Sequence, residues 1–400
     1  MSGPLEGFKV IDLSAVVSGP LTGALLADLG ADVIKVERTV TGDIQRNVGS
    51  RRNGFSGFFH VLNRGKRSIA LNLTTREGCD IVHRLSADAD VVLQNFRPGV
   101  VERLGIDYAR LCADNPGLVY LSISGFGQSG PRAKDRAYDP IIQAYAGITD
   151  VQGSIHRDNP DQPEQVNMLL LDKLTAWTGC QAIMAALLAR SRTGKGQHVE
   201  LSMLDTAISF IWSDVAADLI LQGDDVDRRP PIRASGTMQT YADGHGFTMT
   251  LSQPEFEGLC RAYGLDHIAE DARFASLDLR MRHRAELREI ISSEVDEVAL
   301  ELTVAQAEER LLRHEVPFAR VRRLADLPED EQIQHNQMFR ELNHPVAGPL
   351  RDARPAPRFA STPAEPGGPA PSVGEHTRQI LEEISMGAET EKLFERGIVS

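Results

Sequence analysis

Cysteine is scarce in this chain, and the positions of the four cysteines exclude two kinds of stabilised fold. No two of them form a CxxC pair, the usual spacing of zinc and redox sites. A disulfide framework is typical of small secreted domains, and four cysteines spread over 400 residues do not form that pattern. We therefore expect neither a metal site nor disulfides, and we interpret the cysteines as small hydrophobic residues of the core: Cys79, Cys112, Cys180 and Cys260.

Long apolar runs and an excess of basic residues are also missing. No uncharged apolar stretch reaches the roughly 20 residues that a membrane span needs, so we expect no membrane association. Residues 1–7 contain no basic segment followed by an apolar core, which predicts a cytoplasmic protein. The formal net charge of -13 disfavours nucleic acid as a partner, because phosphate backbones are bound by basic patches.

The first part of the chain alternates strand and helix patterns. Residues 8–13 and 31–37 have the composition of strands, and residues 20–29 between them have a helical pattern, which together predict a βαβ unit. Further strands are predicted at residues 68–73, 91–95 and 118–123, with helical segments at 76–87 and 108–113. We therefore expect an α/β fold with a Rossmann-like, doubly wound, mostly parallel sheet.

The turn after the first predicted strand lacks the glycine pattern of dinucleotide-binding proteins. Residues 18–23 are SGPLTG, which is not GxGxxG, and Leu21 stands where a glycine would have to admit a pyrophosphate. A nicotinamide or flavin cofactor is therefore not expected. Arg38 follows the second strand and places a cation at the edge of the sheet where such folds bind ligands.

The pattern changes in the second half of the chain. A strand at 199–203 and a helix at 204–221 are predicted before a polar break at 222–231, which has the composition of a linker. A smaller α+β segment follows, with a predicted strand at 246–251 and helices at 255–263, 284–293 and 304–313. Residues 345–371 are rich in Pro, Ala and Gly and predict an extended connector before a last helix at 375–385.

These changes predict three parts. The composition, with 42% hydrophobic and 25% charged residues, suits a globular chain large enough for two domains. We expect a large α/β domain at 1–222, a small α+β domain at 223–325, and a return segment at 326–400 whose C-terminal helix packs on the large domain.

Asp172 is the residue that most directly suggests chemistry. It follows an apolar run at residues 166–171 and precedes a long uncharged helix predicted at 174–189. At or near the N-cap of that helix, free backbone N–H groups and the helix dipole would keep its carboxylate ionised. An ionised, partly desolvated carboxylate can attack an activated acyl carbon. Because aspartate is also a preferred N-cap residue, the pattern leaves both roles open, a cap and a nucleophile.

Six short motifs in order along the chain carry a resemblance to a known family. They are VIDL at 10–13, LGADVIKVER at 29–38, KRSI at 66–69, NFRPG at 95–99, TGKGQ at 193–197 and GEHT at 374–377. Together they resemble the family III CoA-transferases, the CaiB/BaiF group that includes formyl-CoA transferase. α-Methylacyl-CoA racemases belong to the same superfamily.

The resemblance implies an acyl-CoA:carboxylate CoA-transferase that needs no cofactor beyond coenzyme A. Its substrates would be an acyl-CoA donor and a carboxylic acid acceptor, and Asp172 would be the catalytic residue that carries coenzyme A as an aspartyl thioester. The family also implies a homodimer of interlocked chains. Carried over by position, contacts to coenzyme A are implied for Val17, Ser18, Arg38, Leu71, Asn72, Leu73, Thr74, Asn95, Phe96, Arg97, Arg103, Arg136, Ala137, Tyr138 and Asp139.

Two alternatives remain at this stage. A racemase would move a proton beside the thioester with a pair of acid/base groups, typically a histidine and an aspartate. The position of that histidine is occupied by Tyr138, and no histidine lies between His83 and His156. The second alternative is an acyl-CoA-binding protein without turnover, in which substitution of Asp172 would have no effect on function.

Overall fold

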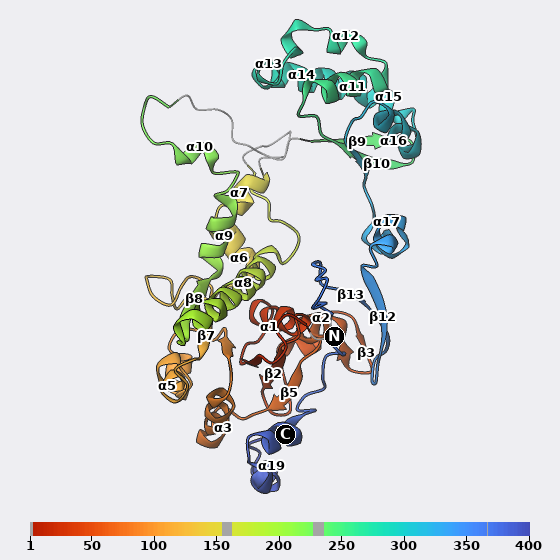
Figure 1. Ribbon diagram of the computed structural model, residues 1–400. Helices are drawn as coiled ribbons and strands as arrows, with labels where there is room; N and C mark the ends of the chain where they lie inside the picture. Colours follow the sequence, from red (N-terminus) through yellow and green to blue (C-terminus); the bar gives the residue numbers. More distant parts are fainter. Residues whose placement is uncertain (1–2, 154–161, 227–235, 366) are drawn as a thin grey trace. The chain divides into compact units, whose positions relative to one another are not determined.

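The computed structural model describes residues 3–153, 162–226, 236–365 and 367–400. The chain divides into two compact units, which we treat separately (Figure 1). Unit 1 consists of Met1–Ala216 and Asn336–Ser400, and unit 2 is Ala217–His335. The first division, after residue 216, lies near the boundary expected at 222, the second, after residue 335, lies beyond the one expected at 325, and the expected linker at 222–231 lies partly outside the described residues.

A six-stranded parallel sheet forms the centre of unit 1. Its strands are β1 (Lys9–Asp12), β2 (Asp32–Glu37), β5 (Arg67–Ala70), β6 (Val91–Gln94), β7 (Val119–Ser124) and β8 (Gln197–Ser202). They lie in the order β5-β2-β1-β6-β7-β8, and each neighbouring pair is parallel. This is the order of the doubly wound dinucleotide-binding fold, in which the direction of winding reverses between the first and fourth strands, here β1 and β6. The expected α/β class and parallel sheet are confirmed.

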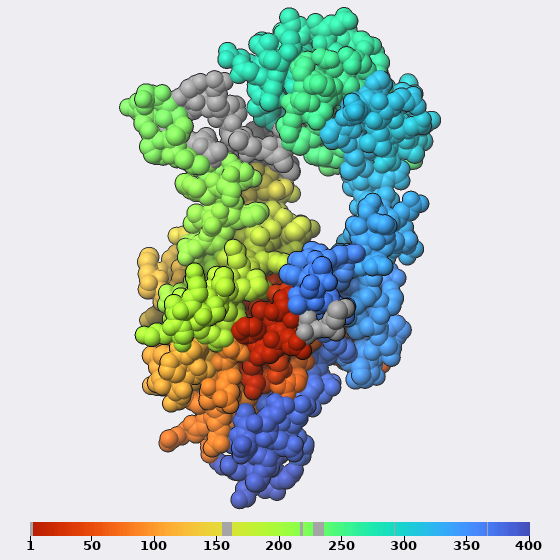
Figure 2. Space-filling view, viewed as in Figure 1, coloured from red at the N-terminus to blue at the C-terminus, as the bar shows by residue number. Residues whose placement is uncertain are grey.

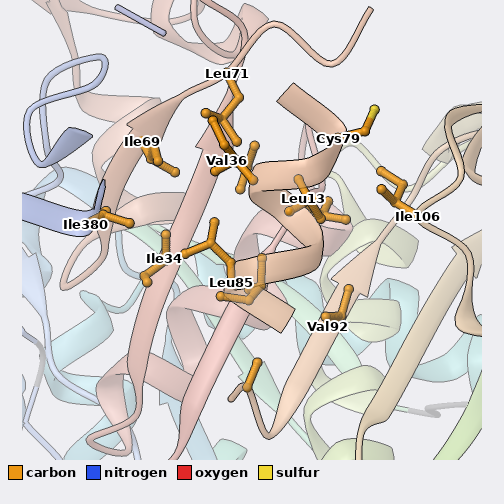
Figure 3. Packing of buried hydrophobic residues seen from close by; sticks show 14 of the residues in the cluster. Leu13, Ile34, Val36, Ile69, Leu71, Cys79, Leu85, Val92, Ile106 and Ile380 are labelled. Carbon is orange, nitrogen blue, oxygen red and sulfur yellow. The ribbon is translucent and has the colours of Figure 1, made fainter. Parts of the chain in front are cut away.

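Helices cover both faces of this sheet because successive strand residues point to opposite faces. Ile11, Ile34 and Val92 face a cluster with α3 (Arg76–Ala87), α5 (Tyr108–Asp114), α18 (Thr377–Glu383) and α19 (Thr390–Glu395), shown in part in Figure 3. Their neighbours Val10 and Val33 face the other cluster, with α1 (Ser18–Asp28) and α8 (Leu170–Thr193). Strands buried on both faces explain the near-continuous apolar runs in the sequence.

The remaining helices and strands of unit 1 surround this core. They are β3 (Arg51–Arg52), β4 (Phe55–Ser56), α2 (Gly57–Asn63), α4 (Val100–Leu104), α6 (Asp139–Tyr145), α7 (Ile148–Gly153), α9 (Met203–Ile211), β12 (Phe339–His344) and β13 (Gly348–Ala353). The helix expected at 204–221 is therefore too long. Beyond α9, the Ser213 hydroxyl donates to the Ser209 and Phe210 carbonyls, and Asp214 accepts from the Val215 N–H, local bonds that compete with a helix.

The return segment packs on unit 1 through a buried cluster of charges. Figure 2 shows its blue surface against the red and orange surface of the N-terminal part. Asp352 of β13 accepts from Arg64 at 3.3 Å, and Arg64 pairs with Asp28 at 2.6 Å. The hairpin β12–β13 occupies the beginning of the region expected as an extended connector, so that connector is shorter than the predicted residues 345–371.

Unit 2 has its own antiparallel sheet and its own core. The sheet has the order β11-β10-β9, formed by Phe318–Arg320, Gly244–Thr248 and Thr237–Tyr241. Its helices are α10 (Ala217–Ile220), α11 (Gln253–Tyr263), α12 (Asp266–Ala269), α13 (Leu277–Arg282), α14 (Arg284–Ile290), α15 (Asp296–Leu300), α16 (Val304–Arg313) and α17 (Glu331–His335). Across the described residues of both units, no helix is both long enough and apolar enough to cross a membrane.

Candidate active site

Two loops meet at the reversal point of the sheet, beyond the carboxyl ends of β1 and β6. Asn95, just after β6, accepts a hydrogen bond from the Ala15 N–H at 2.9 Å and donates one to the Ala15 carbonyl at 2.7 Å. Ligands of open α/β sheets bind in the crevice at this reversal point. The first loop leads directly into α1, whose N-terminus contains Ser18.

Asp172 lies in the first turn of α8 but is not its N-cap. The helix begins at Leu170 with Leu169 as the N-cap residue, so Asp172 is the third helical residue. The expected position at or near the N-cap is therefore confirmed, but Asp172 is not the cap itself. The free N–H groups at a helix start need acceptors, and Leu169 offers no side-chain acceptor, so a residue from elsewhere in the chain fills this role.

That residue is Asp139, the first residue of α6. One carboxylate oxygen of Asp139 accepts from the Asp172 backbone N–H at 2.8 Å, and the other accepts from the Gln143 amide at 2.6 Å. Asp139 is 1% exposed and Gln143 is fully buried. Gln143 also accepts from the Val166 N–H at 2.9 Å and donates to the Met168 carbonyl at 3.2 Å. The pair thus fixes both the start of α8 and the loop that precedes it.

The Asp172 carboxylate itself interacts with the N-terminus of α1. The Ser18 hydroxyl and the Ser18 backbone N–H lie beside it and lower its pKa. The net effect raises the pKa of Asp172 from 3.8 to about 6: burial is the largest cause, the nearby charge of Asp139 adds to it, and the Ser18 donors oppose both. Asp172 was expected to be ionised at neutral pH and a pKa of about 6 agrees with this, although desolvation raises the pKa more than the donors at a helix start lower it. A pKa near 6 still leaves most of the carboxylate ionised at pH 7 and makes it more basic.

A pH profile should show this shifted group. Because only the ionised carboxylate can attack, we expect kcat/KM to be constant above the pKa of Asp172, about 6, and to fall about tenfold per pH unit below it. The measurement is kcat/KM for an acyl-CoA at constant ionic strength between about pH 4 and 8, a range of about two units on either side of the expected midpoint. A midpoint near the ordinary aspartate value would contradict the account of Asp172.

A second feature is a cavity of about 380 Å³ between α3 and α4. It brings together three of the residues implied by the resemblance, Leu73, Thr74 and Arg103. Two arginines that the resemblance did not include, Arg76 and Arg110, also line it. Three guanidinium groups around one cavity favour a ligand that carries phosphate, because their planar forks match phosphate oxygens.

The structure does not bring all the implied residues to one place. Arg38, Arg97, Arg136 and Tyr138 are exposed, and Tyr138 has 63% of its surface accessible. Other members of the set are buried or partly buried and contact the protein itself. Leu71 and Phe96 pack in the cluster around α3, and Ala137 packs beside α6. Asn72 accepts a hydrogen bond from the Thr74 N–H, and Val17 directly precedes α1. Leu71 is 1% exposed as a whole residue, and its N–H donates to the Glu37 carbonyl at 2.8 Å, so its backbone is also held within the protein.

Comparisons with known proteins agree with this geometry. The sequence model of the family described as CoA-transferase family III matches residues 5–377. A succinate–glutarate CoA-transferase of Agrobacterium fabrum is 34% identical over 95% of this chain and 96% of its own length. A succinyl-CoA:mesaconate CoA-transferase of Haloarcula marismortui is 32% identical over 98% of this chain and 99% of its own length.

Solved structures lead to the same family. The crystal structure of a CaiB/BaiF family protein from Brucella suis aligns with a TM-score of 0.81 and 32% identity, covering 96% of this chain and all of the other. A crystal structure of a Mycobacterium tuberculosis protein aligns with a TM-score of 0.80 and 29% identity over 94% of this chain and 98% of the other. The chain therefore belongs to the family III CoA-transferases and is an enzyme of that family.

Proposed function

We propose that this enzyme moves coenzyme A from an acyl-CoA to a free carboxylic acid through a covalent aspartyl-CoA thioester on Asp172. The observation that carries the proposal is the state of this carboxylate. It is partly buried at the reversal point of the sheet, the N–H of the same residue is held by Asp139 at 2.8 Å, and burial raises its pKa to about 6. A carboxylate that is both ionised and more basic than usual is a better nucleophile than an exposed aspartate.

The proposed reaction proceeds through two acyl exchanges. The Asp172 carboxylate attacks the thioester carbon, the carbon–sulfur bond breaks, and a mixed anhydride and the CoA thiolate result. The thiolate attacks the Asp172 carbonyl of this anhydride and expels the donor acid as its carboxylate, leaving aspartyl-CoA. The acceptor carboxylate then attacks that thioester, and the released thiolate takes the acceptor acyl group and regenerates Asp172.

Each step replaces one activated acyl bond by another, so the proposed sequence needs no cofactor beyond coenzyme A. Each step produces an oxyanion, which donors already aimed at the site would stabilise. The Ser18 N–H is such a donor, since it belongs to the first turn of α1, where backbone N–H groups have no partner within the helix.

The phosphates of coenzyme A would be bound by the cavity between α3 and α4. Arg76, Arg103 and Arg110 supply the charges there, and Thr74 supplies a hydroxyl. Arg38, Arg97 and Arg136 are exposed cations that extend this charge along the carboxyl edge of the sheet. The cavity lining therefore has three arginines against one acid, Asp80, and this local excess of positive charge suits an anionic substrate.

The test is a transfer assay with the purified full chain. The two curated relatives described above are named for dicarboxylic acids, so we expect succinyl-CoA with a second dicarboxylate to give a new acyl-CoA detected by liquid chromatography and mass spectrometry. The same reaction in D₂O separates the racemase alternative. Deuterium at the carbon next to the thioester without a new acyl-CoA would contradict the transferase proposal.

We also propose that the active form is a homodimer. The outer face of α8 exposes Trp177, Met184 and Leu188 at 51%, 38% and 65% of their surfaces, while Ala176 and Ile183 on its inner face are fully buried. A helix that is apolar on both faces is normally covered on both. The occupant we propose is a second copy of this chain, and the family resemblance implies that the two copies interlock.

Light scattering is expected to give the mass of two chains. We expect Leu188→Glu to lower the thermal midpoint of the dimer, because a charge would replace a buried apolar contact. Ala109→Glu, at an exposed position of α5 and outside this face of α8, is the control and should leave the midpoint unchanged. A wild-type protein with the mass of one chain would contradict the proposal.

A further inference from the structure

The turn between β1 and α1 contains a valine with a left-handed backbone. Val16 has a φ of 73°, a region in which a β-branched residue is a clear outlier. The cost arises because its Cβ crowds the neighbouring carbonyl oxygen. Such strain persists only where surrounding contacts fix the backbone, and it is concentrated at functional sites.

Asn95 is the first contact that holds this turn. Its amide oxygen accepts from the Ala15 N–H and its amide nitrogen donates to the Ala15 carbonyl, at 2.9 and 2.7 Å. The two bonds fix the peptide groups on both sides of Ala15, directly before Val16. They come from a residue 80 positions away in sequence, on the loop after β6.

Buried charges hold the rest of the turn. Asp12 accepts from the Ser14 N–H at 2.9 Å, and Lys35 donates to the Ser14 carbonyl at 3.0 Å. Asp43 accepts from the Val16 N–H at 3.4 Å and pairs with Lys35 at 3.1 Å. The side chains of Lys35 and Asp43 are 0% and 2% exposed. The backbone on both sides of Ala15 is therefore fixed by side chains from four separate positions.

The turn presents Ser18 to the nucleophile. Ser18 comes two residues after Val16, is 4% exposed, and lies beside the Asp172 carboxylate, whose pKa its hydroxyl and N–H lower. Ser18 also accepts from the Thr22 hydroxyl, which reaches the Ala176 carbonyl of α8 at 3.3 Å. A change in the backbone at Val16 would rotate the start of α1 relative to Asp172.

We propose that Asn95 is a positioning residue for the nucleophile: it fixes the left-handed turn at Val16 so that Ser18 holds the Asp172 carboxylate in the orientation for attack. The inference rests on the proposed function of Asp172. It also assigns Asn95 a different role from the contact to coenzyme A that the resemblance implied, because both polar groups of its amide are used by Ala15.

The first test is Asn95→Ala. We expect kcat to fall about tenfold, since small misplacements of a reacting group are costly, while KM for the acyl-CoA changes less than about twofold. We also expect the acid limb of the pH profile to move to higher pH, because the donors that lower the pKa of Asp172 become less well placed. Asp139, which faces the same carboxyl from α6, is unchanged in this variant.

Asn115→Ala is the matched control. The Asn115 amide nitrogen donates to the Ser86 and Ala89 carbonyls at 3.0 and 2.8 Å, and its oxygen accepts from the Gly117 N–H at 3.2 Å. Its loss removes similar bonds at the amino end of β7, away from Asp172. We expect a comparable loss of thermal stability from both variants but an unchanged kcat and acid limb in the control.

The variant Val16→Gly distinguishes the effect of the left-handed backbone on catalysis from its effect on stability. Glycine adopts the left-handed backbone without a Cβ, so we expect the thermal midpoint to stay the same or rise. Because glycine also frees the turn, kcat should fall while KM for the acyl-CoA is retained. An increase in KM for Asn95→Ala without a change in kcat would make Asn95 a contact to coenzyme A and overturn the proposal.

A measurement without turnover distinguishes this inference from the proposed function. The Asp172 carboxyl can be titrated by NMR with ¹³C-labelled aspartate and assigned by its absence in Asp172→Asn. A higher pKa of Asp172 in Asn95→Ala than in the wild type supports the positioning role even if no CoA transfer is detected. An unchanged pKa together with an unchanged kcat would overturn it.

Discussion

Replacement of Asp172 by asparagine is expected to lower kcat by about 10⁴-fold or more, because an amide cannot form the proposed acyl intermediate. The same substitution should stabilise the protein. Burial and the charge of Asp139 raise the pKa of Asp172 from 3.8 to about 6, so the ionised form costs stability above about pH 6. This cost disappears as the pH falls below the unfolded value. Removing the charge should therefore increase the free energy of unfolding at pH 8 by about 1–3 kcal/mol.

The control for this prediction is Asp205→Asn. Asp205 is the third residue of α9, as Asp172 is of α8, and its N–H is capped by Ser202. We expect the control to retain kcat and to show no gain in stability. Urea unfolding at pH 8 and the transfer assay measure the two effects. An Asp172→Asn variant that loses stability together with activity would indicate a structural role for Asp172.

Asp139→Ala is expected to damage both stability and catalysis. It leaves the Asp172 N–H without its acceptor and removes a partner of Gln143, both in a buried setting. Unsatisfied buried donors of this kind cost about 1–3 kcal/mol each, so we expect a loss of about 2–4 kcal/mol in the free energy of unfolding. The start of α8 would loosen, and kcat should fall about 10²-fold. The acid limb should move to lower pH, because the charge of Asp139 raises the pKa of Asp172.

Asp243→Ala is the matched control in unit 2. Asp243 accepts from the Val304 N–H at 2.7 Å and so caps α16 from another segment, as Asp139 caps α8. We expect it to lower the free energy of unfolding by about 1 kcal/mol and to leave the acid limb in place. If Asp139→Ala shifted the acid limb to higher pH or left it unmoved, the charge coupling between Asp139 and Asp172 would be contradicted.

The strands of the parallel sheet and the helices between them could be predicted from the sequence. The segments at 8–13, 31–37 and 91–95 are apolar on both faces and are separated by helical patterns, which leaves few topologies. The helix expected at 204–221 was too long, because helix propensity does not include the local hydrogen bonds that Ser213 and Asp214 form after α9. The hairpin β12–β13 was missed because a composition rich in Pro and Gly concealed it.

The site was only partly predictable. The helix after Asp172 indicated where a carboxylate would stand, but its acceptor and donor partners come from distant segments. Asp139 lies 33 residues before it, and Ser18 belongs to α1. Only the fold brings them together, so the raised pKa of Asp172 could not be deduced. A possible signal was the spacing of Asp139 and Gln143, which are four residues apart and therefore neighbours on one helix face.

Peptide mass spectrometry after trapping tests the central claim most directly. The full chain is incubated with succinyl-CoA, treated with hydroxylamine, digested and analysed. We expect a hydroxamate on the peptide that contains Asp172, absent without succinyl-CoA and absent from Asp172→Asn, because hydroxylamine attacks aspartyl thioesters and anhydrides but not free carboxylates. A hydroxamate on another acid, or none on Asp172 while coenzyme A transfer proceeds, would contradict the account.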